Sequence, residues 1–114
     1  MARGRKSQGK KAKSSNKPYY PLKEVNSKIA QNKYDITNKA LVEAQRDFGW
    51  VKKDIANSLK KLRRNQCHKT ERSTKSPMVM FDVYHAKNLN GENVYTKLYI
   101  HKDRLKIISF HELK

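Results

Sequence analysis

The sequence of 114 residues predicts an α+β fold in which N-terminal helices pack on an antiparallel sheet formed by the C-terminal half. Apolar residues recur at helical spacing up to Leu62, whereas apolar and polar residues alternate from Met78 onward. The alternating region is divided into three strands by two turn signals, Asn90-Gly91 and Lys102-Asp103. Helices that come first and an antiparallel sheet that follows define the α+β class.

The first helix is expected to run from Pro21 to about Asn32. Proline suits the first position of a helix, because its missing N–H would have no partner there. The spacing of Leu22, Val25 and Ile29 gives this helix one apolar stripe. We expect that stripe to face the sheet.

A second helix follows a short extended piece at residues 34–36. Thr37 is the expected N-cap, because its hydroxyl can accept a hydrogen bond from a free N–H of the first turn. Gly49 is the expected C-terminal cap, since glycine adopts the left-handed conformation at little cost. The side chains expected to point inward are Ala40, Leu41, Ala44 and Phe48.

The third helix is expected to bury Val51, Ile55 and Leu59, with Ala56 and Leu62 beside them. Basic residues occupy its other faces or lie just beyond its end, and they are Lys52, Lys53, Lys60, Lys61, Arg63 and Arg64. Exposed helix faces are normally charged, so we interpret them as a solvated face in preference to an RNA or antitoxin contact.

The strands are expected at residues 78–86, 94–101 and 105–110. Residues 66–74 could form an irregular strand or a loop. Asp82 is the one carboxylate inside a strong strand, and we expect it to accept structural hydrogen bonds in preference to acting as a general base. Cys67 is expected to be a half-buried small side chain, since nothing nearby would activate it.

Charge and composition limit the function. Lys and Arg number 27 against 10 Asp and Glu, which gives a formal charge of +17. Such a chain repels itself unless it meets a polyanion, and the candidates are nucleic acid, an acidic protein and an anionic membrane.

Apolar runs are far too short to span a bilayer, so we expect a cytoplasmic protein without a membrane association. One cysteine excludes an internal disulfide, and we expect no metal or cofactor.

Residues 1–17 are expected to form a disordered basic arm. They hold seven basic residues and no acidic residue, and no large apolar group follows Met1. The arm could bind phosphates without sequence preference or could merely keep the chain in solution, and both readings stay open. Residues 18–114 are expected to form a single folded domain.

The positions taken as non-core in the three strands are rich in phenols, ammoniums and imidazoles, namely Tyr84, His85, Tyr95, Lys97, Tyr99, His101, Lys106 and His111. These groups can bind a phosphodiester, stack on a base and move protons. RNA carries its own nucleophile, the 2′-OH, so an enzyme need only orient it, transfer protons and neutralise the phosphorane. The pattern therefore points to RNA cleavage.

Several segments resemble the MqsR family of bacterial toxins. They are the helix Val-Lys-Lys-Asp-Ile-Ala-Asn-Ser-Leu, the pair His68-Lys69, and the strands Phe81-Asp82-Val83-Tyr84, Val94-Tyr95-Thr96-Lys97 and Ile108-Ser109-Phe110-His111. The resemblance covers residues 18–114. It implies a RelE-like α+β fold, an mRNA-cleaving endoribonuclease of a type II toxin–antitoxin pair, and a cognate antitoxin, MqsA-like or other.

The resemblance also implies site residues. The family's catalytic lysine falls on Lys69 and its strand tyrosine on Tyr95, while a C-terminal lysine falls on His111 and a strand glutamine on Phe81. The last two are departures. An imidazole at His111 would suit general acid catalysis near neutral pH, whereas Phe81 can only stack on a base or pack. The residues expected to bind RNA are Arg72, Phe81, His85, Lys97 and His101.

The Asn90-Gly91 turn admits two registers. A two-residue turn places Phe81 and Tyr95 on opposite faces of the sheet. A three-residue loop with Gly91 in a bulge shifts the register by one and places Phe81 beside Tyr95. We favour the bulged hairpin, which the family alignment requires.

Two functional classes remain open at this point. The first is a metal-independent toxin that cuts single-stranded mRNA by 2′-OH attack. The second is a non-catalytic RNA-binding or ribosome-associated protein, for which the charge of +17 would be sufficient. A DNA-binding module ranks third, because no helix-turn-helix is convincing.

Overall fold

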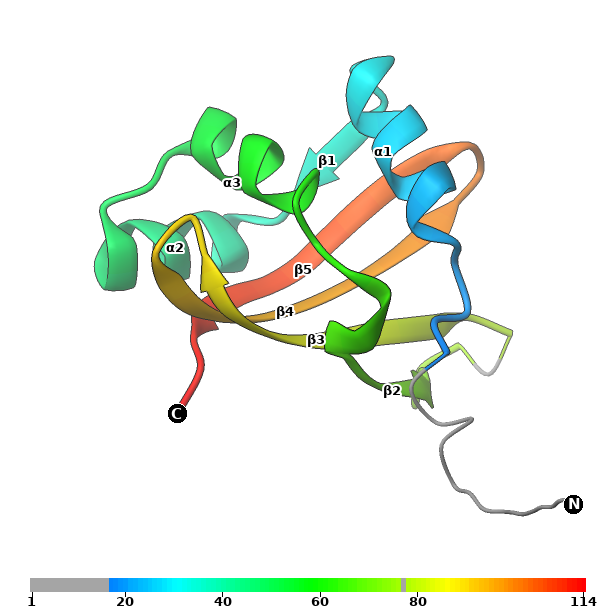
Figure 1. Ribbon diagram of the computed structural model, residues 1–114. Helices are drawn as coiled ribbons and strands as arrows, with labels where there is room; N and C mark the ends of the chain where they lie inside the picture. The colour runs from blue at the N-terminus through cyan, green and yellow to red at the C-terminus, as the bar shows by residue number, and fades with distance from the viewer. Residues whose placement is uncertain (1–16, 77) are drawn as a thin grey trace, which may run out of the picture.

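A computed structural model describes residues 17–76 and 78–114, in which three helices cover one face of a five-stranded sheet (Figure 1). The helices are α1 Leu22–Ala30, α2 Asn38–Phe48 and α3 Lys52–Leu59, followed by a 3₁₀ turn, η2 Arg64–Gln66. The strands are β1 Tyr34–Ile36, β2 Cys67–Arg72, β3 Met80–Leu89, β4 Glu92–His101 and β5 Arg104–Glu112. The predicted α+β fold is confirmed. The expected arm lies outside the described residues, apart from Lys17.

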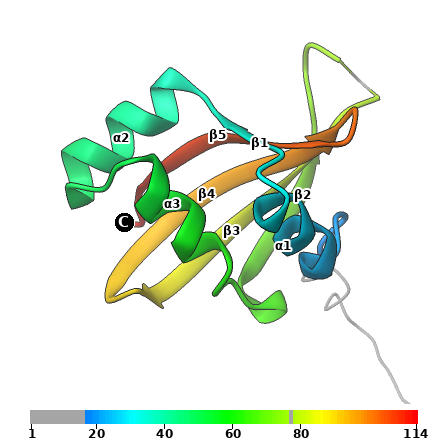
Figure 2. The same cartoon turned by 90° about the horizontal axis from the view of Figure 1, so that it is seen from above.

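The sheet has the strand order β1-β5-β4-β3-β2. The predicted meander of β3, β4 and β5 forms its centre. The extended piece at residues 34–36 adds β1, which pairs in parallel with β5, and the segment left open between strand and loop adds β2 at the other edge. All three helices lie on the same side of the sheet, as the view from above shows (Figure 2). Among the described residues, no helix is long and apolar enough to cross a membrane.

Local signals placed the ends of α2 correctly. The backbone N–H of Ala40 donates to Thr37 Oγ1 at 3.1 Å, so Thr37 caps the helix. Gly49 ends it in the left-handed conformation with φ of 72°. The expected burial of Val51 is wrong, because Val51 is the N-cap of α3 and its side chain is 57% exposed. Its N–H donates to Asp54 Oδ2 at 2.9 Å, so the apolar face of α3 begins only at Ile55.

The core lies between the helices and the inward side chains of the sheet. From the helices it takes chiefly Val25, Ile29, Ala40, Ala44, Ile55 and Leu59, and from the sheet chiefly Tyr84, Ala86, Val94, Leu98, Leu105, Ile107 and Phe110. Tyr84 was taken as a non-core position, and this was wrong, since its side chain is fully buried. Side chains alternate along a strand, so Tyr84 and His85 must lie on opposite faces. Burial raises the pKa of the Tyr84 phenol well above its usual range.

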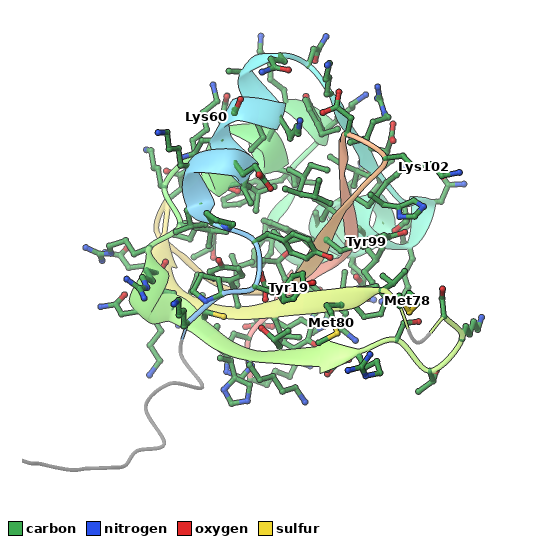
Figure 3. All side chains as sticks on the ribbon, turned by 90° about the vertical axis from the view of Figure 1, so that its right-hand side faces the viewer. Tyr19, Lys60, Met78, Met80, Tyr99 and Lys102 are labelled. Atoms are coloured by element: carbon green, nitrogen blue, oxygen red, sulfur yellow. The ribbon has the colours of Figure 1, made fainter. Side chains whose placement is uncertain are left out.

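Asp82 has the structural role expected of it. It is fully buried, and its two oxygens accept the backbone N–H groups of Tyr19 and Tyr20 at 2.9 and 2.8 Å. The Thr70 hydroxyl donates to the same carboxylate at 2.6 Å. This carboxylate thus fastens the segment before α1 to β3 and β2, and Figure 3 shows Tyr19 beside β3. Cys67 is also buried, and burial raises the pKa of its thiol to about 11.

The hairpin between β3 and β4 combines features of both expected registers. Leu89 pairs with Glu92, so the turn has two residues, Asn90 and Gly91, and the favoured three-residue loop is wrong. The register nevertheless shifts by one, because a bulge lies between Ala86 and Leu89.

The bulge decides which side chains share a face. His85 pairs with Tyr95, which places Phe81 on the same face as Tyr95, as the family alignment requires. The ring beside Phe81, however, is that of Tyr99, with 5.1 Å between the ring centroids.

Carboxylates of α2 close part of the free edge of β5. The N–H of Phe110 donates to Glu43 Oε1 at 3.0 Å, and the N–H of Glu112 donates to Asp47 Oδ2 at 2.8 Å. These groups lie beyond the three residues that pair with β1. The α2 carboxylates therefore take the place of a neighbouring strand there.

Candidate active site

The face of the sheet opposite the helices is called the open face here. Seven of the eight predicted site residues lie on it, and they are Lys69, Phe81, His85, Tyr95, Lys97, His101 and His111. They come from four consecutive strands, β2 to β5. The register of the sheet alone brings them together.

Four rings cross the open face in one line, which we call the ring row: His68 on β2, His85 on β3, Tyr95 on β4 and His111 on β5. The ring centroids of His68 and His85 are 3.9 Å apart with an interplanar angle of 10°. Those of His85 and Tyr95 are 5.6 Å apart at 42°, and those of Tyr95 and His111 are 4.6 Å apart at 12°. The two outer pairs are therefore stacked, whereas His85 and Tyr95 are tilted against each other.

His68 was not among the predicted site residues. A bulge in β2 places His68 and Lys69 on the same face, because His68 is inserted between Cys67, which pairs with Tyr84 of the core, and Lys69, which pairs with Val83. Strict alternation would have placed neighbouring residues of β2 on opposite faces. Its position beside the predicted catalytic lysine was the one available signal.

Glu71 joins the two lysines of the open face. Its carboxylate lies 2.8 Å from Lys97 Nζ and 3.2 Å from Lys69 Nζ. The hydrogen bond from Lys97, with a smaller contribution from Lys69, lowers the pKa of Glu71. Lys97 Nζ also lies 5.7 Å from the centroid of the Phe81 ring. The two ammonium groups are therefore held side by side, next to the ring row.

The hydrogen bonding of His111 settles which nitrogen can exchange a proton with a substrate. Its Nδ1 lies 2.9 Å from the carbonyl oxygen of Glu112. A carbonyl can only accept, so Nδ1 carries a hydrogen. In the neutral ring Nε2 is then the base, and in the charged ring it is the acid.

His85 occupies a different environment from the ends of the row. Burial lowers the pKa of its imidazole, and the neighbouring His68 and Lys69 lower it further. His85 is therefore held toward the neutral form, in which one ring nitrogen donates and the other accepts.

Arg72 does not join the other predicted residues. It pairs with Met80, two positions after Thr70, whose hydroxyl binds the buried Asp82. The alternation of the strand therefore directs Arg72 to the helix-bearing side of the sheet. The prediction grouped Arg72 with the site because the sequence does not show which residues of β2 face which side of the sheet.

Two further predicted residues lie away from the centre of the ring row. Phe81 contacts Tyr99 edge to face, and His101 lies 6.2 Å from Tyr99 between ring centroids. His101 pairs with Arg104 at the end of the β4–β5 hairpin. These side chains share the open face, but they lie beside the ring row and are not part of it.

Comparison with known families identifies the family of the chain. The family model described as "Motility quorum-sensing regulator, toxin of MqsA" matches residues 17–112, which include every helix and strand. No curated protein sequence matched the chain. The match covers far more than half of the chain and includes the open face. The protein therefore belongs to the MqsR family, the toxins of toxin–antitoxin systems in which an antitoxin is the partner.

Proposed function

We propose that this toxin is a metal-independent endoribonuclease that cleaves single-stranded mRNA in the cytoplasm by attack of the 2′-OH. The observation that carries the proposal is the ring row, with Lys69 and Lys97 beside it on the open face. Membership of a family of mRNA-cleaving toxins supports a nuclease role. The expected products are a 2′,3′-cyclic phosphate and a 5′-OH.

The reaction needs two proton transfers and one charge to be neutralised. The 2′ oxygen forms a bond to phosphorus and loses its proton, while the bond to the 5′ oxygen breaks and that oxygen gains a proton. Nε2 of His111 is available for one of these transfers, because Nδ1 is engaged with Glu112. The Tyr95 hydroxyl lies on the neighbouring ring and can donate a hydrogen bond to the reacting phosphate.

Lys69 would neutralise the charge that develops on the phosphorane. Its ammonium group is already placed by Glu71 on the same face as the ring row. Lys97 would bind a neighbouring phosphate, and Phe81, His85 and His101 would contact the RNA around it. Arg72 is left out of this arrangement, because the strand register directs it to the other side.

The test is an RNA cleavage assay in EDTA with the purified protein and its Tyr95→Phe variant. We expect the unmutated protein to cut and the variant to lose most of its turnover. The new 3′ ends should carry a cyclic phosphate. Cleavage that disappears in EDTA, or that is equal in both proteins, would contradict the mechanism.

A second candidate function is non-catalytic binding of RNA or of the ribosome. The formal charge of +17 and the exposed basic residues of α3 would be sufficient for it. The same assay separates the two, since tight RNA binding by an unmutated protein that never cuts would favour the second candidate.

The antitoxin of this protein is proposed to be the product of a small adjacent gene, MqsA-like or other. Its acidic side chains would complement the basic toxin surface. Expression of the toxin alone should arrest growth, and co-expression of the partner should relieve the arrest. Tolerated expression of the unmutated chain alone would count against the toxin activity proposed here.

A further inference from the structure

The His68 ring stacks on His85 with one face, and within the described residues no ring covers its other, outer face. β2 is one of the two edge strands of the sheet, and Figure 3 shows it running below β3. His68 is exposed, and its one ring contact within the described residues is the stack on His85. A flat aromatic face is thus held at a fixed angle at the end of the ring row.

The other ring faces of the row have less room. His68 covers one face of His85, and Tyr95 and His111 cover one face of each other. The 5.6 Å between the centroids of His85 and Tyr95 is too small for another ring to enter between them. An additional stacked ring therefore fits only at an end of the row, and of the two end rings His68 is exposed whereas His111 is half-buried.

Electrostatics distinguishes the two ends of the ring row. At the His111 end, the nearby Glu43 and Asp47 side chains are carboxylates that bind the edge of β5. Both of these carboxylates are paired, Glu43 with Lys39 and Asp47 with Arg46. At the His68 end, Glu71 is shared between Lys69 and Lys97, so one ammonium group remains in excess. A polyanion that crosses the open face is therefore attracted more strongly at the His68 end.

We propose that His68 forms a nucleobase subsite, in which a base of single-stranded RNA stacks on the outer face of the imidazole. The bound base extends the ring row by one ring, and it belongs to the same RNA segment as the reacting phosphate that Lys69 holds. The subsite binds the nucleotide that leaves the reaction centre over the β2 edge. The proposal rests on the proposed function, because it takes RNA as the substrate.

The test measures binding without cleavage. Short 2′-O-methyl RNA oligonucleotides cannot be cut by 2′-OH attack, so their Kd reports binding alone. His68→Ala should raise the Kd about tenfold, within the range for losing one stacked base. His68→Phe keeps a flat ring without a charge and should bind nearly as well as the unmutated protein. His68→Gln keeps polarity without the ring face and should behave like alanine.

A double-mutant cycle locates the contact. A single abasic nucleotide is moved along the oligonucleotide, and Kd is measured for the unmutated protein and for His68→Ala. At one position the abasic site should weaken binding to the unmutated protein about tenfold and barely affect the variant, because the partner ring is already gone. At other positions the two effects should multiply. Lys23→Ala on α1 is the control for removing a positive charge elsewhere.

Two results would overturn the proposal. One is His68→Phe binding as weakly as His68→Ala, since the ring nitrogens and not the ring face would then be responsible. The other is multiplied effects at every abasic position. Thermal melts of all variants show whether the fold is retained. RNA that binds with this coupling but is never cut when unmodified would refute the proposed function and leave the subsite standing.

Discussion

Tyr95 and His111 are cross-strand partners on β4 and β5, and their rings stack with 4.6 Å between centroids and 12° between planes. The stack orients the imidazole, and the Glu112 carbonyl fixes its tautomer. Two groups that can exchange protons are therefore held side by side, and the His85 ring lies 5.6 Å from Tyr95 on its other side.

The first prediction concerns Lys69 and His111. Lys69→Ala and His111→Ala should each lower the rate of RNA cleavage by roughly 10² or more, the range for losing a positioned proton-transfer or charge-stabilising group. Single-turnover cleavage of one RNA measures the rate. Near-normal turnover in both variants would refute the catalytic assignment, and thermal melts must accompany the assay, because lost folding would imitate lost chemistry.

Local sequence signals predicted the fold well where a single residue decides the backbone. Thr37 and Gly49 were placed correctly as caps of α2, since hydroxyl capping and the left-handed conformation depend on few neighbours. Val51 was placed in the core because its spacing fits the apolar stripe of α3. The apolar stripe does not reveal where the helix begins. Asp54 accepts a hydrogen bond from the Val51 N–H, so Val51 is the N-cap and lies just before the first residue of α3.

The site was harder to predict, because it depends on the register between strands. The bulge at His68 and the bulge between Ala86 and Leu89 each change which side chains share a face. No local residue pattern marks either bulge. Arg72 was therefore grouped with the site and His68 was left out, although both lie within the strand that contains Lys69.

The second prediction concerns Glu71, whose carboxylate forms ion pairs with both Lys69 and Lys97 on the open face. An RNA phosphate must displace it in order to pair with them. Glu71→Gln should therefore lower the Kd for non-cleavable RNA several-fold at low salt, because two ammonium groups lose their counter-ion. A higher Kd in this variant would mean that Glu71 is needed to position the lysines.

The third prediction concerns the carboxylate that holds the segment before α1. Asp82→Ala leaves the N–H groups of Tyr19 and Tyr20 without their acceptor, and should lower the free energy of unfolding by roughly 2–4 kcal/mol. Urea denaturation measures the loss, and amide exchange at the two tyrosines should accelerate. Asp82→Asn keeps an acceptor oxygen and should lose less. Equal stability of Asp82→Ala and the unmutated protein would contradict this role.

The fourth prediction is a pH dependence of stability at the edge of β5. Hydrogen bonds from Arg46 and from the Glu112 N–H lower the pKa of Asp47 to about 2, from an ordinary 3.8. A carboxyl group with a lowered pKa in the folded state stabilises that state above its unfolded pKa. The contribution is lost as the pH falls from about 4 through 2.

Asp47→Asn should therefore lower the free energy of unfolding at pH 6, and the difference from the unmutated protein should shrink toward pH 2. Chemical denaturation at a series of pH values measures both. A difference that is constant over this range would show that the charge of Asp47 does not contribute.

The last prediction separates the basic residues before Pro18 from the active site. Phosphate contacts of Lys and Arg are electrostatic and independent of sequence, so each contact that is lost reduces the salt slope of single-stranded RNA binding by about 0.7. Deletion of residues 2–16 removes Arg3, Arg5, Lys6, Lys10, Lys11 and Lys13. The deletion should weaken RNA binding at low salt and flatten its salt dependence. Cleavage position and saturated turnover should change little, because both depend on the geometry of the open face.

Tyr95→Phe is the matched comparison for this deletion. It should abolish most of the turnover and leave the salt slope nearly unchanged, since it removes one hydroxyl and no charge. Kd titrations over a series of salt concentrations, run beside cleavage mapping of one RNA, give both quantities for both proteins. If the deletion instead moves the point of cleavage, residues 2–16 contribute to specificity, and the division of the chain at Pro18 into a basic arm and a catalytic domain is wrong.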